Sequence, residues 1–182
     1  MATEYVSLSA FSLANCTSYD KPQPLPTVVH IEDPARDVFF DFLIIKPLVI
    51  NAHQYMHEAK KIMENRTLHV MLVLDDNSSE FIGIIALEDI LGTKPVQLQR
   101  TYNIELKDLF VKHMMVARDK LVAIDYHNVE TAKVGHIIKT LHELNQHFLF
   151  VTEKSPEDGS IRLRGIFTDT QINKQLGGAT PH

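Results

Sequence analysis

The sequence predicts an α/β (α+β) fold in which two pseudo-symmetric repeats pack through their sheets. Each repeat reads as strand, helix, strand, strand and helix. The first observation is a duplicated motif: Gly-Ile-Ile-Ala-Leu-Glu-Asp-Ile-Leu at 83–91 is echoed by Gly-Ile-Phe-Thr-Asp-Thr-Gln-Ile at 165–172. The second is a pair of apolar runs, 70–73 and 148–151, one ahead of each motif. Such a duplication indicates two similar units that each bury a face against the other.

The composition is that of an ordinary folded chain. Of the 182 residues, 45% are hydrophobic and 23% are charged, which suffices for one globular unit or two small ones with a real core. The net charge of −5, with no basic arm, argues against nucleic-acid polymers as partners. The longest apolar stretch, 38–50, is interrupted by Asp41, Lys46 and Pro47, so no membrane span is predicted.

Cysteine usage bears on the compartment. The single cysteine, Cys16, allows no disulfide within the chain and no cysteine-based zinc site. A lone cysteine fits a reducing compartment, and the first residues lack the pattern of a secretory signal. We therefore expect a cytoplasmic protein.

Residues 1–35 differ from the rest and are expected to form an extended arm. They contain Pro22, Pro24, Pro26 and Pro34. Proline resists helices and inner strands, while the run 28–31 predicts an edge strand. For 1–20 a loosely ordered terminus is the alternative. Apolar residues that would anchor the arm on the body or on a second subunit are Tyr5, Val6, Leu8, Phe11 and Leu13.

The first repeat is assigned to 36–92. Its expected elements are a helical turn at 36–41, a strand at 48–50, a helix at 53–65 with Asn51 as its N-cap, strands at 68–74 and 81–85, and a helix at 87–91 closed by Gly92. Helical spacing of apolar residues, turn residues and capping residues place these boundaries.

The second repeat is assigned to 106–178, after a polar connector at 93–105, and a tail follows at 179–182. Its expected elements are a helix at 106–115, a strand at 121–124, one helix capped by Asn128 or Thr131 and ending near Asn145, strands at 147–152 and 161–167, and a closing helix at 168–176. Asn and Thr are suited to N-cap positions because a side-chain oxygen accepts from a free backbone N–H.

This order of motifs resembles a tandem pair of CBS domains, a Bateman module, over roughly residues 36–178. The resemblance implies a stand-alone regulatory protein that performs no catalysis. It implies an adenosyl ligand, namely AMP, ADP, ATP or S-adenosylmethionine, bound in a cleft between the repeats. It also implies a homodimer that signals to an effector protein.

The resemblance places ribose and phosphate contacts in the motif Gly-hydrophobic-hydrophobic-Ser/Thr-x-x-Asp. The first repeat keeps Asp89 but has Ala86 in place of the hydroxyl, and the second keeps Thr168 but has Gln171 in place of the carboxylate. An ionised carboxylate accepts two hydrogen bonds at once, whereas Gln weakens binding by roughly 1 kcal/mol. Asp89 is therefore the better predicted ribose site.

Both motifs also have interpretations that need no ligand. Thr168 and Gln171 match a capping box at the start of the closing helix. Asp89 is equally a surface carboxylate in a first helical turn, where the helix dipole favours negative charge. If both sites are degenerate, the alternative function is a ligand-free structural or interaction scaffold.

The adenine slot is implied between the short strand and the buried strand of each repeat. The matching residues are Ile50 and Asn51 with His69 and Val70, and Ile124 and Asp125 with His147 and Phe148. A protonated histidine there would meet a phosphate. The favoured alternative is that both histidines satisfy local hydrogen bonds at strand rims.

Other sites are weaker. His53 and His57 have a spacing that suits a metal on a helix, but ordinary helical amphipathicity is the favoured explanation, so no metal site is predicted. No catalytic residue is predicted either. Candidate dimer surfaces lie on the closing helices and on the segment that starts the second repeat: Ile90, Leu91, Ile172, Leu176, Leu109, Phe110 and Met114.

Overall fold

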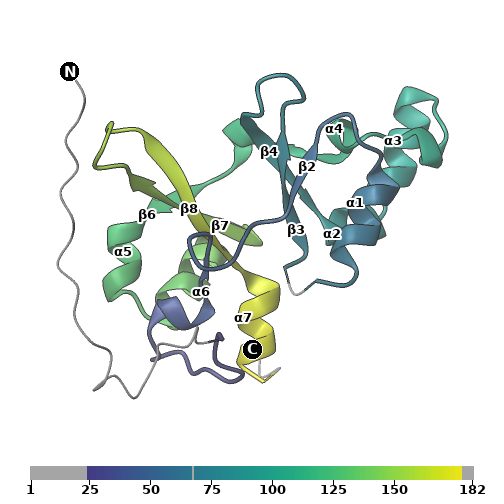
Figure 1. Cartoon of the computed structure of the whole chain (residues 1–182). Coiled ribbons are helices and arrows are strands. Elements are labelled where there is room, and N and C mark those ends of the chain that lie inside the picture. Colours follow the sequence, from purple (N-terminus) through teal and green to yellow (C-terminus); the bar gives the residue numbers. More distant parts are fainter. Residues whose placement is uncertain (1–23, 67, 178–182) are drawn as a thin grey trace, which may run out of the picture.

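The structure is a computed structural model that describes residues 24–66 and 68–177. It holds two four-stranded sheets, with strand orders β2-β3-β4-β5 and β1-β8-β7-β6. Figure 1 shows the two sheets beside each other, with α1 and α2 next to one and α6 and α7 next to the other. The predicted α/β fold of two sheet-packed repeats is thereby confirmed.

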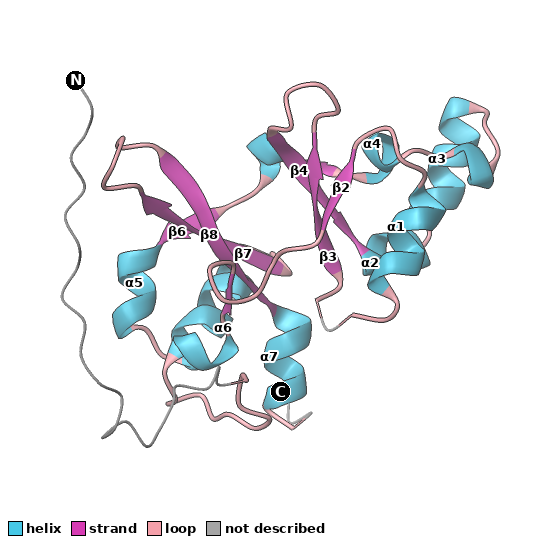
Figure 2. Cartoon of the chain, in the orientation of Figure 1, coloured by secondary structure: helices cyan, strands magenta, loops and turns pink. Residues whose placement is uncertain are grey.

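Helices and strands follow one another along the chain in both halves (Figure 2). From η1 to α3 they are η1 (Ala35–Val38), β1 (Phe40–Asp41), β2 (Val49–Asn51), α1 (Met56–Met63), β3 (Val70–Leu74), β4 (Phe81–Ala86), α2 (Leu87–Leu91) and α3 (Lys94–Tyr102). The remainder are η2 (Leu106–Asp108), α4 (Val111–Met114), β5 (Val116–Ala117), η3 (Arg118–Lys120), β6 (Ala123–Asp125), α5 (Tyr126–Thr131), α6 (Val134–Glu143), β7 (Phe148–Lys154), β8 (Ile161–Thr168) and α7 (Asp169–Gln175).

Three apolar clusters hold these layers together. One lies between the first sheet and its helices and includes Ile50 and Met63. A second lies between the other sheet and its helices and includes Ile137. The third joins the facing surfaces of the two sheets, where Val70 of β3 and Phe150 of β7 are both buried. Because the side chains of a strand alternate between its faces, each sheet contributes to two clusters at once.

Each sheet gains an edge strand from the start of the other repeat. β1 pairs antiparallel with β8 of the second sheet, and β5 pairs antiparallel with β4 of the first. A Cβ added at Gly165 would collide with the carbonyl of Phe40, and one at Gly83 with the carbonyl of Val116. The glycines of the duplicated motif thus permit the close approach of the exchanged strands.

The exchange also moves side chains between the cores. Val38 and Phe39, from the start of the first repeat, pack in the second cluster. Leu109 and Met114, from the start of the second repeat, pack in the first. The repeats at 36–92 and 106–178 therefore exchange their first elements in three dimensions.

The first-repeat helix begins later than predicted. α1 starts at Met56, and its N-cap is Tyr55, whose N–H donates to the Glu58 carboxylate at 2.9 Å. Asn51 instead ends β2, and its N–H donates to Gln54 Oε1 at 3.0 Å. The prediction of Asn51 as N-cap was wrong, because strand β2 continues past the apolar residues Val49 and Ile50 and includes Asn51.

The single helix predicted to end near Asn145 is two helices. α5 begins after Asp125, whose carboxylate accepts from the His127 N–H at 2.9 Å, and α6 begins after Lys133. Between them the backbone is extended, because residues 33–35 bond to it: Ala35 N–H donates to Ala132 O, and Val134 N–H to Asp33 O, both at 2.9 Å. Asn128 and Thr131 consequently cap neither helix.

The connector predicted at 93–105 contains helix α3, with Pro95 in its first turn, where proline's missing N–H costs nothing. Two other local predictions were wrong. The helix predicted at 106–115 is broken, because Leu109 is extended and its carbonyl accepts from the Met56 N–H at 2.8 Å. The run at 28–31 forms no strand; the Val29 N–H bonds to the Gln175 carbonyl at 2.9 Å instead.

Most of the candidate dimer residues are buried in the chain's own cores. Ile90, Leu109, Met114 and Ile172 are at most 6% exposed, so they cannot form an outer surface. Leu91 remains available, at 61% exposed. Cys16 and the anchors proposed within 1–20 lie outside the described residues. Within the part of the chain that the structure describes, no helix has the length and apolarity to cross a bilayer.

Candidate functional site between the repeats

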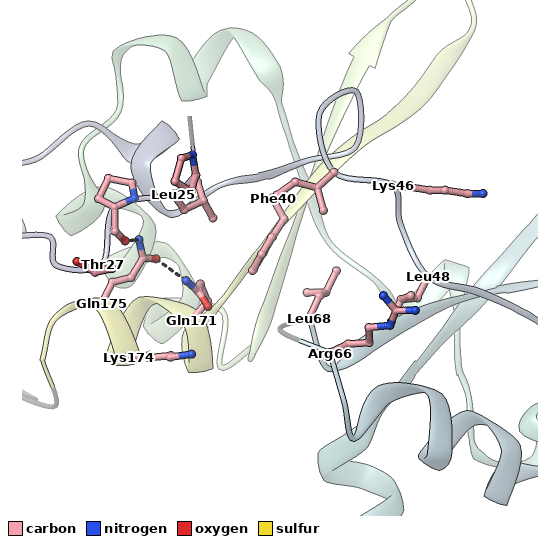
Figure 3. A pocket seen from close by; sticks show the side chains of 13 residues that line it. Leu25, Thr27, Phe40, Lys46, Leu48, Arg66, Leu68, Gln171, Lys174 and Gln175 are labelled. Atoms are coloured by element: carbon pink, nitrogen blue, oxygen red, sulfur yellow. Dashed lines mark hydrogen bonds between the residues drawn. The ribbon is translucent and has the colours of Figure 1, made fainter. Parts of the chain in front are cut away.

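A cleft of about 540 Å³ opens between the two halves, and we call it the inter-repeat cleft. Its apolar surface comes from Phe40 of β1 and from Leu48 and Leu68, which precede β2 and β3. One side is formed by α7, and another by residues 24–27, which we call the wall segment. Figure 3 shows these elements converging from distant parts of the sequence. The volume is within the range of small-molecule sites.

The charged residues of the cleft are all cations. Lys46 comes from the loop before β2, Arg66 from the chain after α1, and Lys174 from α7 (Figure 3). Within 24–66 and 68–177, none of the residues that line this cleft is acidic. All three cations are exposed at the rim, so the cleft combines an apolar interior with a positive entrance.

Two buried glutamines of α7 connect the cleft to the wall segment. The Gln171 amide N–H donates to Gln175 Oε1 at 2.9 Å, and the Gln175 amide donates to the carbonyls of Pro26 at 2.5 Å and Asp37 at 2.9 Å. Gln171 is 9% exposed and Gln175 only 2%. The sequence reasoning missed Gln175, although its spacing of four from Gln171 places both on one helical face.

Thr168 serves as the N-cap of α7. Its hydroxyl accepts from the Gln171 N–H at 3.2 Å, as the capping interpretation predicts. The reciprocal half of the capping box is absent, because the Gln171 side chain is bonded to Gln175. Gln171 lines the inter-repeat cleft, whereas Thr168 does not.

The first copy of the motif lies elsewhere. Ala86 is 2% exposed and packs in the cluster between the sheets. Asp89 lies in the first turn of α2, where its carboxylate is 3.7 Å from Lys94 Nζ. Neither residue lines the inter-repeat cleft. The environment of Asp89 is that of a partly exposed surface carboxylate, as its alternative interpretation supposed.

Five of the sequence-predicted residues meet at a tight contact between the repeats. His69, Val70, Phe148, Thr168 and Gln171 surround a space of only about 10 Å³. Beside it, Thr170 donates to the Glu88 carboxylate at 2.7 Å, which joins corresponding positions of the two motifs. A space of this size holds about one water, so it serves as a contact between the repeats.

The remaining slot residues are spread over separate environments. Ile50 is buried in the first core, and Ile124 packs against the second. Asn51 is exposed, and Asp125 caps α5. The cleft uses Leu48 and Leu68 in their place, each two residues before the expected Ile50 and Val70. The sequence signal that could have identified Leu48 and Leu68 is that each is an apolar residue just ahead of a predicted strand.

The two corresponding histidines differ in their surroundings. Each carbonyl accepts from the first residue of a closing helix: Leu87 N–H bonds His69 O at 2.9 Å, and Asp169 N–H bonds His147 O at 3.1 Å. Among the described residues, a side-chain partner is seen only for His147, with its Nδ1 2.5 Å from the Asp169 carboxylate. That hydrogen bond raises the pKa of His147, aided by the charges of Asp169 and, more weakly, Glu88.

The histidine pair considered as metal ligands is separated by the helix start. His53 precedes α1 and bonds the Asp76 carboxylate at 2.6 Å, whereas His57 stacks on Tyr55. Among the described residues, no cluster of three or more side chains is arranged to hold a metal ion.

Comparison with known proteins identifies the class. Residues 35–94, from η1 to the start of α3, match the CBS domain family. The chain therefore contains a CBS domain, and its two-sheet architecture matches that of CBS-pair structures. The curated proteins offer no significant sequence match.

Three solved structures share the fold. An uncharacterized conserved protein from Pyrococcus horikoshii has a TM-score of 0.54 at 15% identity, over 85% of this chain and 98% of that one. CBSX2 in complex with AMP has 0.50 at 15%, over 80% and 97%. The CBS domain of the bacterial CNNM/CorC family Mg²⁺ transporter in complex with ATP has 0.50 at 14%, over 82% and 91%.

Proposed function

We propose that this protein is a non-catalytic regulatory module that binds an adenine nucleotide in the inter-repeat cleft and signals to a partner protein whether the nucleotide is bound. The carrying observation is one cleft of about 540 Å³ that joins an apolar interior to three cations. The surface of Phe40, Leu48 and Leu68 suits a flat purine, because burial of an aromatic face is favourable. The cations suit phosphate oxygens, which form strong charge-assisted hydrogen bonds.

The charge of the cleft favours nucleotides over S-adenosylmethionine. The sulfonium of that ligand is a cation, and among the described residues no acidic side chain lines the cleft to receive it. Between solvent-exposed charges, each like-charge contact costs about 1 kcal/mol or less, and salt screens it further. AMP, ADP or ATP is therefore the expected ligand class.

Two structural relatives support this class of ligand. CBSX2 is described in complex with AMP, and the CNNM/CorC transporter CBS domain in complex with ATP. The proposed site differs from the one favoured by the motif alone. It lies beside Gln171 of the second repeat, whereas Asp89 of the first repeat lies away from the cleft.

Calorimetric titration of the nucleotide-free protein with AMP, ADP, ATP and S-adenosylmethionine tests the proposal. We expect a nucleotide to bind, and Arg66→Ala and Lys174→Ala each to weaken it about tenfold, close to the loss of one charge-assisted hydrogen bond. The matched control is Lys120→Ala, at an exposed lysine that does not line the cleft. Tighter binding of S-adenosylmethionine, or no effect of either cleft variant, would contradict the proposed site.

A ligand-free interaction scaffold is the second candidate function. This function is favoured because the polar side chains of the second motif already bond within the protein: Thr168 caps α7, and Gln171 bonds Gln175. Leu43 and Ile44, which are 76% and 72% exposed on the loop after β1, would then be partner contacts. A well-folded protein that gives no heat with any adenosyl ligand would select this function.

We also propose that the protein acts as a cytoplasmic homodimer. The exposed Leu91 at the end of α2 supports a self-association surface on the helical side of the first repeat. Sedimentation velocity on the wild-type protein and on Leu91→Glu tests it. A wild-type protein that sediments as a monomer at micromolar concentration would contradict the homodimer.

A further inference from the structure

The wall segment separates two cavities. Pro24, Leu25 and Pro26 line the inter-repeat cleft on one side. The same three residues line a second cavity of about 670 Å³, whose other walls include Asp41 and Tyr126. The boundary of the inter-repeat cleft is therefore set by chain that precedes the matched CBS domain at 35–94.

Gln175 holds the wall segment at Pro26 and the chain just after it at Val29. Its side-chain amide donates to the Pro26 carbonyl at 2.5 Å, and its backbone carbonyl accepts from the Val29 N–H at 2.9 Å. Leu25 adds an apolar contact, since it packs on the cluster between the sheets that contains Phe40 and Leu68. Two prolines flank Leu25 and fix the backbone φ angles on either side of it.

The glutamine at 171 fits this arrangement in a way that an aspartate would not. Gln171 donates an N–H to Gln175 Oε1, which leaves the Gln175 amide to donate to Pro26 and Asp37. An ionised carboxylate has no hydrogen to donate. Glutamine therefore completes a directional chain from the cleft to the wall segment.

We propose that Gln175 is a positioning residue of the nucleotide site, which fixes residues 24–27 as the outer wall of the cleft. This inference rests on the proposed function. With the wall segment docked the cleft retains about 540 Å³, enough for a small ligand. A nucleotide thus enters without displacing the wall segment and gains contact with it. The site is then incomplete without the chain ahead of the CBS domain.

The test combines hydrogen exchange with AMP titration of the full chain. Gln175→Glu keeps the shape of the side chain but replaces the donor that faces the Pro26 and Asp37 carbonyls. We expect faster exchange over residues 25–29 in the unliganded variant and at least a fivefold weaker affinity for AMP. In the wild-type protein, AMP is expected to slow exchange over the same residues.

Two further variants separate positioning from general damage to the fold. Leu25→Ala loosens the wall segment from its own side without touching α7, and it is expected to weaken AMP binding in the same direction. Gln97→Glu makes the same chemical change on the exposed side of α3 and should leave exchange over 25–29 and AMP affinity unchanged.

The outcomes distinguish the two levels of the proposal. A wild-type protein that binds AMP, with unchanged affinity in both wall variants, overturns the positioning role alone. Tighter binding in either variant would show that the wall segment competes with the ligand, which also overturns it. Absence of AMP binding in the wild-type protein overturns the nucleotide function and, with it, this inference.

Discussion

The two repeats carry the same duplicated motif at the same point of the fold but use its polar positions differently. In the first repeat, Asp89 is partly exposed near Lys94, and Ala86 is buried between the sheets. In the second, Thr168 caps α7 and Gln171 is bonded inside the protein. The shared backbone needs only the glycine and the apolar residues. The polar positions are therefore free to diverge, and in the second repeat they secure the wall segment.

The exchanged edge strands differ as well, which leads to the largest expected effect. Asp41 of β1 forms a bidentate pair with Arg164 of β8, at 2.9 Å for both bonds. The side chains are 11% and 15% exposed. Removal of one member of a buried pair costs about 3 kcal/mol or more. Because Arg164 keeps Glu153 as a second partner, we expect Asp41→Ala to lower the free energy of unfolding by about 3 kcal/mol in urea titration.

The corresponding region at β5 has no such ion pair among the described residues. Arg118 there donates to the Phe81 carbonyl at 2.9 Å from an exposed position. Arg118→Ala is the matched control and should cost less than about 1 kcal/mol, the usual range for a net hydrogen bond. Similar losses for the two variants would show that the two edge strands are held equally.

The Asp41 pair also has a pH signature. Burial acts to raise the pKa of Asp41, but hydrogen bonds from Arg164 and from the Leu43 N–H outweigh it and lower the pKa below its ordinary value. The stabilisation is thus present above the unfolded pKa and lost as pH falls through the folded pKa. Wild-type stability should fall on acidification more steeply than that of Asp41→Ala.

A smaller effect is expected at the helix cap that only the second repeat has. Thr168→Ala removes the hydroxyl that accepts from the Gln171 N–H, at a cost of about 1 kcal/mol by thermal or urea unfolding. The affinity for AMP should change less than twofold, because Thr168 does not line the cleft. Thr101→Ala in α3, where the hydroxyl bonds a helix carbonyl at the surface, serves as the control. A large loss of affinity in Thr168→Ala would indicate that the ligand binds at the duplicated motif and not in the inter-repeat cleft.

Local patterns predicted the regular elements well. The helix at 87–91 has the expected bounds, and the strands at 148–154 and 161–168 differ from expectation by at most two residues. Apolar runs and turn residues act over short range, so they can be recognised along the chain. The interruption at 132–134 could not be, because it is caused by bonds from residues 33–35, about a hundred positions away.

The candidate cleft was predicted only in outline. A site between the repeats followed from the duplication, and Gln171 was among its expected residues. The cleft itself joins Leu48, Lys174 and the wall segment at 24–27, which no pattern along the chain connects. Gln175 was missed because a glutamine near the end of a helix has no distinctive signature until its partners, the carbonyls of Pro26 and Asp37, are placed.

The smallest expected effect concerns the histidine partner that only the second repeat supplies. Asp169 bonds His147 and raises its pKa, whereas the first repeat has Leu87 at the corresponding position. The stabilisation is fully present below the unfolded pKa, near 6.5, and is lost as pH rises through the higher folded pKa. Because the His147 side chain is 70% exposed, the effect on the free energy of unfolding should be about 0.5 kcal/mol.

The variants His147→Gln and Asp169→Asn should each remove the same part of the pH dependence of unfolding, and the double variant should remove no more than either one. Additive losses would show that the two side chains act independently.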